Sequence, residues 1–157
     1  MVDRVRREER LRDLGLVLPE PPEPVASYIP WVVAGGLIFV SGQIPSREGG
    51  LPRTGSVGAE LTIEEGQEEA RYCALNVLAQ LRGAAGTLDM VGRIVRLGVF
   101  VASAPGFTHQ SAVANGASDL MKEVFGDAGK HARAAVGVSE LPLGAPVEVD
   151  AIATLES

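Results

Sequence analysis

Two charged residues, Arg133 and Glu148, stand on apolar stretches near the C-terminus, in the segment HARAAVGVSELPLGAPVEVDAIATL (131–155). A guanidinium presents paired N–H donors that match a carboxylate, so Arg133 is a candidate clamp for an acidic ligand. A carboxylate such as Glu148 can hold a water molecule or accept its proton. The plainer interpretation is an ion pair at a strand edge, and the pattern alone leaves both interpretations open.

The residue types of other site chemistries occur without the spacing that those chemistries need. His109 and His131 lie far apart in the sequence, and no two histidines stand at metal-binding spacing. The sequence has no Gly-x-Ser-x-Gly stretch, and its glycine-rich stretches lack the Lys-Ser/Thr end of a phosphate-binding loop. Ser41-Gly42-Gln43 is a weak signal by itself, because a glycine there also fits a β-bulge. We therefore expect neither a metal ion nor a cofactor.

The bulk properties predict a globular chain that works on small molecules. The 157 residues are 46% hydrophobic and 22% charged, which suits one domain with its own core. A net charge of −6 and only 4% aromatic residues disfavour nucleic acid as a partner. The start, MVDRVRREER, is not a signal peptide, and the longest apolar run (31–40) is too short to span a bilayer. We expect a cytoplasmic protein without a membrane or nucleic-acid partner.

Residues 1–24 are expected to form an N-terminal segment that precedes the domain. A short charged helix over 3–14 is followed by the proline-rich connector PEPPEP (19–24), which cannot be a helix or a central strand. Acidic residues interleave with the arginines of the helix, so we expect a solvated helix face rather than a nucleic-acid patch. These arginines are Arg4, Arg6, Arg7, Arg10 and Arg12.

Residues 25–157 are expected to form a single α+β domain. A hairpin over 28–45 turns at Ala34-Gly35-Gly36, and a capping box in TIEE (62–65) begins a helix that runs to about 83–86. Cys73 lies on the apolar stripe of that helix, which indicates a buried structural thiol. The remaining expected elements are a strand over 93–103, a helix over about 109–125 and two strands within 131–155. Two long helices on one face of a mixed β-sheet give a two-layer sandwich.

Alternation along two strands predicts what covers the sheet, since side chains point to opposite faces in turn. One face of each strand is fully apolar and fits beneath the helices. The opposite faces are mixed, with small or apolar residues among the charged ones, and another copy of the chain would cover them. The expected inward sets are Val95, Leu97, Val99 and Val101 in the first strand, and Val147, Val149, Ala151 and Ala153 in the second.

Three segments together resemble the Rid family, the reactive-intermediate (enamine/imine) deaminases. They are Tyr28 followed by SGQIP (41–45), VGRIVRLGVFV (91–101), and Ala132-Arg133 followed by Leu-Pro and Glu148, in the family's order and near its spacing. The resemblance covers about residues 25–155. It implies a chorismate-mutase-like α+β sandwich that assembles as a homotrimer with clefts between subunits.

The resemblance also implies roles for single residues. Arg133 occupies the position of the arginine that binds the substrate carboxylate, and Glu148 that of the acidic residue which positions the hydrolytic water. Gly42, in the same Ser41-Gly42-Gln43 stretch as the substrate-binding candidate Ser41, matches the glycine whose carbonyl helps to hold this water. Two further substrate-binding candidates are Tyr28, which matches a tyrosine from the neighbouring subunit, and Asn115, whose spacing to Arg133 is one residue longer than usual.

Three departures from the family pattern bear on activity. Ala135 stands where cysteine is common, which is harmless if the backbone of this residue binds the substrate and damaging if a thiol is needed. His131 replaces a common proline and either shapes the cleft or is an exposed loop residue. The first 24 residues extend beyond the short members and resemble a longer-chain subgroup.

These observations favour a hydrolase acting on C=N bonds. The leading hypothesis is hydrolytic deamination of small 2-imino or enamine acids to 2-oxo acids and ammonia, without a cofactor. A non-catalytic trimeric module that binds small carboxylates is the alternative, because it needs Arg133 but not Glu148. A ribonuclease is a distant third, since the acidic charge disfavours RNA.

Overall fold

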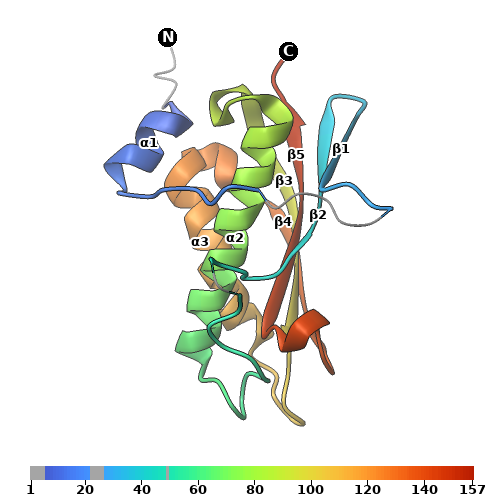
Figure 1. The fold of residues 1–157 in the computed structure, drawn as a ribbon. Coiled ribbons are helices and arrows are strands. Elements are labelled where there is room, and N and C mark those ends of the chain that lie inside the picture. Colours follow the sequence, from blue (N-terminus) through green and yellow to red (C-terminus); the bar gives the residue numbers. More distant parts are fainter. Residues whose placement is uncertain (1–5, 22–26, 49) are drawn as a thin grey trace.

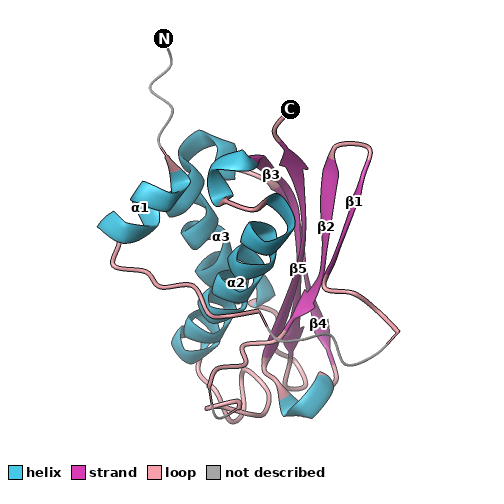
Figure 2. Ribbon diagram, turned by 45° about the horizontal axis from the view of Figure 1, so that its top comes forward, coloured by secondary structure: helices cyan, strands magenta, loops and turns pink. Residues whose placement is uncertain are grey.

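A computed structural model describes residues 6–21, 27–48 and 50–157 of the chain (Figure 1). It has the two predicted layers, a five-stranded sheet and two long helices that pack on one of its faces (Figure 2). A third, short helix lies beside the long pair. The elements are α1 (Arg7–Asp13), β1 (Trp31–Ala34), β2 (Leu37–Gln43), α2 (Ile63–Ala85), β3 (Val91–Ala102), α3 (Gln110–Phe125), β4 (Ala132–Val138) and β5 (Val147–Leu155).

The sheet is mixed, with the strand order β1-β2-β5-β3-β4. β3 and β4 are parallel, and the other neighbouring strands are antiparallel. A parallel pair needs a long crossover between its strands, and α3 is that crossover. β4 stands last in the strand order, so it forms one edge of the sheet, and it lies beside α3. The predicted α+β sandwich is confirmed.

Local sequence signals set the helix boundaries. The capping box is present, because Thr62 Oγ1 accepts a hydrogen bond from the Glu65 amide at 3.1 Å and Glu65 Oε2 accepts one from the Thr62 amide at 2.9 Å. α2 ends at Ala85, and the φ of +84° at Gly86 is one that glycine adopts readily. α1 begins at Arg7, later than the expected residue 3, and residues 3–5 lie outside the described part.

The core lies between the sheet and α2 and α3. Leu97, Val99 and Val101 point into it as expected, as does the whole inward set of β5. The expectation for Val95 was wrong, because Ile94 is the fully buried residue and Val95 is only partly buried. The pairing of β3 with β5 shifts register between Ile94 and Arg96, and such a bulge exchanges the faces of the strand.

α1 packs on the core, and its arginines are not all solvated as expected. Leu11 is buried, and the side chain of Arg7 is also buried, where it donates to the Gly92 carbonyl and lies over the ring of Phe125. Arg10 donates to the carbonyl of Glu123 on α3. Part of the connector (22–24) lies outside the described residues.

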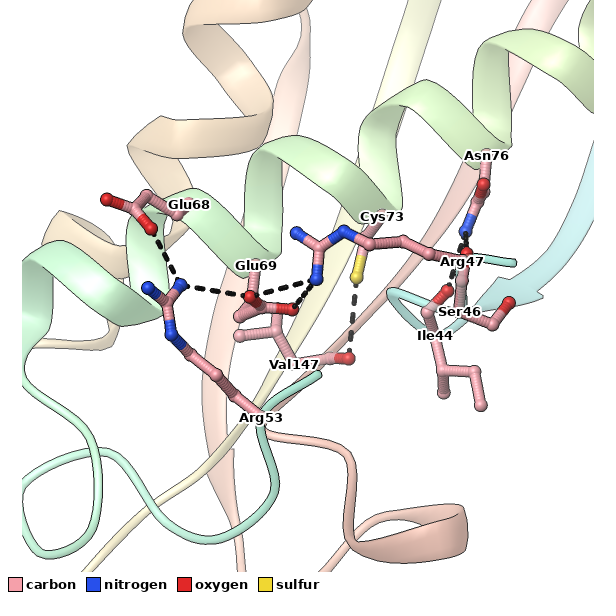
Figure 3. A network of polar contacts seen from close by, with 9 residues as sticks. All are labelled: Ile44, Ser46, Arg47, Arg53, Glu68, Glu69, Cys73, Asn76 and Val147. Atoms are coloured by element: carbon pink, nitrogen blue, oxygen red, sulfur yellow. Dashed lines mark hydrogen bonds and ion pairs between the residues drawn. The ribbon is translucent and has the colours of Figure 1, made fainter. Parts of the chain in front are cut away.

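The loop after β2 is fastened to α2 by a buried carboxylate (Figure 3). Glu69 is fully buried, and it accepts hydrogen bonds from Arg47 at 3.1 and 3.2 Å and from Arg53 at 3.1 Å. Asn76 donates to the carbonyls of Ile44 and Ser46. These bonds hold a loop without regular structure in one place.

Cys73 is the buried structural thiol that was expected. It is fully buried and donates to the Val147 carbonyl at 3.4 Å. Burial raises the pKa of this thiol well above its usual value, so it is protonated and poorly nucleophilic at neutral pH. Of the helices in the described part of the chain, none combines the length and the apolar character that crossing a bilayer demands.

Candidate ligand-binding site

Arg133 is held against α3 by three hydrogen bonds. It pairs with the inward-facing Leu97 across the parallel strands β4 and β3, so its side chain lies on the helix side of the sheet. Nη1 donates to Asn115 Oδ1 at 2.8 Å and to Ser118 Oγ at 3.0 Å, and Nη2 donates to the Ser111 carbonyl at 3.4 Å. The guanidinium is therefore fixed in place at the edge of the sheet.

These bonds leave part of the guanidinium without a partner. A guanidinium has five N–H donors, and three of those of Arg133 are used by α3. Nε–H and one Nη2–H donate to no group within the described residues. Two donors on a fixed, planar group are what a bidentate contact with a carboxylate requires.

The sequence analysis missed Ser111 and Ser118, which hold Arg133 together with Asn115. These residues stand at positions i, i+4 and i+7 of α3, which places them on one side of the helix. Ser111 contributes only its backbone carbonyl, so its residue type carried no signal, and the polar side chains of Asn115 and Ser118 on one side of the helix were a weak one. Only Asn115 was a candidate beforehand, and the structure brings it to Arg133.

His131 belongs to the same hydrogen-bond chain. Its Nδ1 lies 2.6 Å from the Gly129 carbonyl, and its Nε2 lies 2.9 Å from Ser118 Oγ. A carbonyl only accepts, so Nδ1 carries a proton, and Nε2 shares a hydrogen bond with the Ser118 hydroxyl. The half-buried ring thus supports Ser118, which in turn supports Arg133, and the interpretation of His131 as an exposed loop residue was wrong.

Glu148 lies on the opposite face of the sheet, beside a bulge in β2. The pairing of β2 with β5 shifts register between Val40 and Gln43, so Ser41 and Gly42 together face Asp150. A Cβ on Gly42 would lie 2.5 Å from Glu148 Oε1, so a glycine is required for this carboxylate to occupy its place. A bulge, which was one of the explanations left open for this glycine, is present, and it provides the space for the side chain of Glu148.

The carboxyl group of Glu148 has no cation beside it. Burial, and then the negative charge of Asp150, raise its pKa above the usual value. Arg96 lies 3.6 Å from Asp150 and forms its ion pair there. Within the described part of the chain, Glu148 makes no ion pair, which leaves its oxygens available to a water molecule or a ligand.

Arg133 and Glu148 do not meet within one chain. Arg133 pairs with Leu97 and Glu148 with Phe100, on the two sides of β3. Two strand spacings and three residues along the strand put their Cα atoms roughly 14 Å apart, with the side chains on opposite faces. The ion pair between them that the sequence left open is therefore absent from the single chain.

The other candidates divide between the same two faces. Ser41 Oγ donates to the Ile29 carbonyl at 2.8 Å and so fastens the segment that carries Tyr28, whose side chain is 60% exposed. Ala135 pairs with Val99 and packs its methyl group against the core. His109 precedes α3 and lies edge-on to Phe107, away from His131. No cluster of metal-ligating side chains occurs among the described residues.

Fold and site together define an α+β protein with a fixed arginine at one edge of its sheet and an unpaired carboxylate on the open face. A family model described as "YjgF/chorismate_mutase-like, putative endoribonuclease" matches residues 8–155. TCP17 of Trypanosoma cruzi is 52% identical over 148 residues, which cover 94% of this chain and 92% of that protein. The chain therefore belongs to the YjgF/RutC-like family, the Rid family.

Solved structures and a more distant relative agree with this membership. The structure of Atu1372 from Agrobacterium tumefaciens, a protein of unknown function, aligns with a TM-score of 0.89 and 44% identity, over 96% of this chain and 92% of that one. E. coli TdcF with bound serine aligns with a TM-score of 0.60 and 26% identity, over 88% and 97%. The 2-iminobutanoate/2-iminopropanoate deaminase of Dermatophagoides farinae is 30% identical over 138 residues, 88% of this chain and 93% of that protein.

Proposed function

We propose that the protein hydrolyses small 2-imino acids to 2-oxo acids and ammonia. The observation that carries the proposal is the fixed guanidinium of Arg133, with two N–H donors left for a carboxylate. The E. coli TdcF structure holds serine, which carries a carboxylate beside an amino group, and the D. farinae relative is named for imino-acid deamination. Both support a small carboxylate ligand here.

Glu148 is the group that we assign to the water molecule. Water adds to the carbon of the protonated C=N bond, and the tetrahedral adduct then loses its nitrogen. One iminium ion and one water molecule give one 2-oxo acid and one ammonium ion, so no redox partner is needed. A carboxylate with a raised pKa is a better proton acceptor than an ordinary one, and Glu148 has this property. Gly42 lies against this carboxylate, which supports assigning it to the same water molecule.

The two faces of the sheet supply two half-sites that we propose to meet between subunits of a homotrimer. The first half-site is Arg133 with Asn115, and the second is Glu148 with Gly42 and Tyr28. Because they lie on opposite faces of one chain, a complete site needs the first half from one copy and the second from another. Val32, Phe39 and Val136 are 40–48% exposed large apolar side chains, and a neighbouring subunit would cover them.

The backbone interpretation of Ala135 fits this arrangement. Its methyl group packs against the core, so a side chain here is not directed to a ligand at the sheet edge. β4 is an edge strand, and its outer row of N–H and C=O groups has no strand partner within the described chain. A backbone contact with the substrate therefore does not require a thiol at this position.

Mixing two inactive variants tests both the chemistry and the shared site. Imine is generated by an amino-acid oxidase, and its decay is followed with and without protein. We expect Arg133→Ala and Glu148→Gln each to abolish the acceleration, with the oligomer intact by light scattering. When equal amounts are refolded together, about one cleft in four receives both intact halves, so roughly a quarter of the activity returns.

Three other outcomes would contradict parts of this proposal. Activity that persists in Arg133→Ala refutes the clamp. Two inactive variants that stay inactive after mixed refolding place both residues in one subunit's site. A Glu148→Gln protein that binds propanoate as the wild type does, while the wild type itself hydrolyses no imine across a panel of amino acids, supports the alternative of a carboxylate-binding module.

A further inference from the structure

A cavity of about 280 Å³ lies directly beside Arg133, on the helix side of the sheet. One wall is the C-terminal half of α3, and the other is the turn that leads into β4. The turn can approach α3 closely because Gly129 packs against the backbone of Met121 and Lys122, where a Cβ would not fit. The cavity is lined by Ser118, Asp119, Lys122, Gly129, Lys130, His131 and Arg133.

The charge of this lining is opposite to that of the whole chain. The protein carries a net charge of −6, yet the cavity is lined by three permanent cations, Lys122, Lys130 and Arg133, and by one carboxylate, Asp119. Asp127, which pairs with Lys130 at 2.9 Å, is 94% exposed and does not line the cavity. Even when the charge of Asp127 is counted against Lys130, three cations stand against two carboxylates, and one net positive charge on an acidic protein favours an anionic ligand.

Lys122 is the cation available for a second anionic group. Its side chain forms no ion pair or hydrogen bond within the described residues, although its charge contributes to the lowered pKa of the exposed Asp127 carboxyl. It stands one helical turn after Ser118, which touches Arg133 at 3.0 Å, so its Cβ lies about 5–6 Å further along α3. The two cations therefore line one cavity about one helical turn apart, which suits a short ligand with an anionic group at each end.

We propose that this cavity is a second subsite and that the ligand of Arg133 is a small dicarboxylate, with Lys122 holding its second carboxylate. This inference rests on the proposed function for the first carboxylate, and it assigns the substrate class as dicarboxylic 2-imino acids. A dicarboxylate offers one carboxylate to the guanidinium of Arg133 and one to the ammonium group of Lys122.

Binding of unreactive acids tests the subsite without depending on catalysis. The probes are succinate, with two carboxylates, and butanoate, with one, measured by titration calorimetry on the full chain at pH 7. We expect succinate to bind at least ten times more tightly than butanoate. Lys122→Ala should remove that advantage and bring succinate to the affinity of butanoate. Arg12→Ala removes one positive charge from exposed α1, outside the cavity lining, and should leave the advantage in place.

The outcomes separate this inference from the proposed function. Equal affinity for the two acids, or an advantage that survives Lys122→Ala, overturns the second subsite. An advantage that is lost in Lys122→Ala supports it, even if the protein hydrolyses no imine, and then only the proposed reaction fails. If imine hydrolysis occurs while succinate has no advantage, the reaction stands and the substrate class is monocarboxylic.

Discussion

Glu69 and Glu148 are both withdrawn from water, yet they have opposite surroundings. Glu69 is fully buried and accepts hydrogen bonds from two arginines, one of which lies over the ring of Tyr72 at 3.9 Å. Glu148 is half-buried, has no ion-pair partner among the described residues, and lies near a second carboxylate on Asp150. Figure 3 shows Glu69 with both arginines bonded to its carboxylate.

The difference indicates what each carboxylate does. Glu69 contributes to stability because its buried charge is compensated by the hydrogen bonds of two arginines. Glu148 opposes folding at neutral pH, since its raised pKa means that the folded chain disfavours the ionised form. A group that costs stability, is seated by a glycine and lies open to a ligand is characteristic of a site that performs chemistry.

Glu148→Gln should produce the largest change in activity. We expect imine hydrolysis to fall by about 10²–10⁴-fold, because glutamine cannot accept a proton from water. The same change should raise Tm at pH 7, since it removes the disfavoured charge. The folded pKa is the higher one, so Glu148 supports folding only when protonated, and that support is lost as pH rises through the folded pKa. The gain in Tm should therefore shrink as the pH falls through the folded pKa, and it should be gone once the pH is below the ordinary value of about 4.5. A lower Tm at pH 7 would contradict this comparison.

Glu69→Gln should lower the stability of the protein, where Glu148→Gln raises it. It leaves Arg47 and Arg53 without their shared carboxylate, and we expect a loss of about 3 kcal/mol in unfolding free energy, or roughly 6–12 °C in Tm. Urea unfolding measures this loss. The matched control is Glu68→Gln, which removes the other partner of Arg53, because Glu68 is 63% exposed and such pairs contribute about 0–1 kcal/mol. Equal losses of unfolding free energy in Glu69→Gln and Glu68→Gln would show that burial does not make the ion pairs of Glu69 more stabilising than the exposed pair of Glu68.

The sequence was sufficient for the elements but not for all of their faces. The capping box at Thr62 and the alternation in β5 are local patterns, and the structure reproduces both. The bulge at Ile94 is a property of pairing between strands, so alternation within β3 alone assigned Val95 wrongly. Arg7 was assigned to solvent from the charges around it, yet packing against Phe125 buries it.

Pairing between elements also decides the positions of the site residues. Alternation placed Glu148 on the open face, because the residues on either side of it are apolar. β4 has small residues on both faces, so nothing in its own sequence indicated where Arg133 points. Pairing with Leu97 decides that, and the partners of Arg133 then come from α3, a separate element.

Gly42→Ala tests the seat of Glu148 with a smaller change. The added Cβ would lie 2.5 Å from Glu148 Oε1, so the carboxylate must move, and we expect about a tenfold loss in kcat/KM. Overpacking should also cost about 1–2 kcal/mol in unfolding free energy. In a Glu148→Ala background the contact is gone, so the stability cost of Gly42→Ala should largely disappear. An unchanged cost there would trace it to the backbone of the bulge instead.

Asp150→Asn should have the smallest effect, on pH dependence alone. If Glu148 must be ionised to act on water, kcat/KM falls as the pH drops through its pKa, which burial and Asp150 hold above the usual value. Removing the charge of Asp150 removes the second of the two causes and so lowers that pKa. The acid limb of the profile should therefore move to lower pH, while burial, the larger cause, keeps it above the ordinary position. Asp13→Asn, an exposed carboxylate on α1, should leave the limb in place. An acid limb that does not move in Asp150→Asn would show that the titration of another group controls kcat/KM. Glu148 would then differ from Glu69 in its ion pairs without having the proposed role in catalysis.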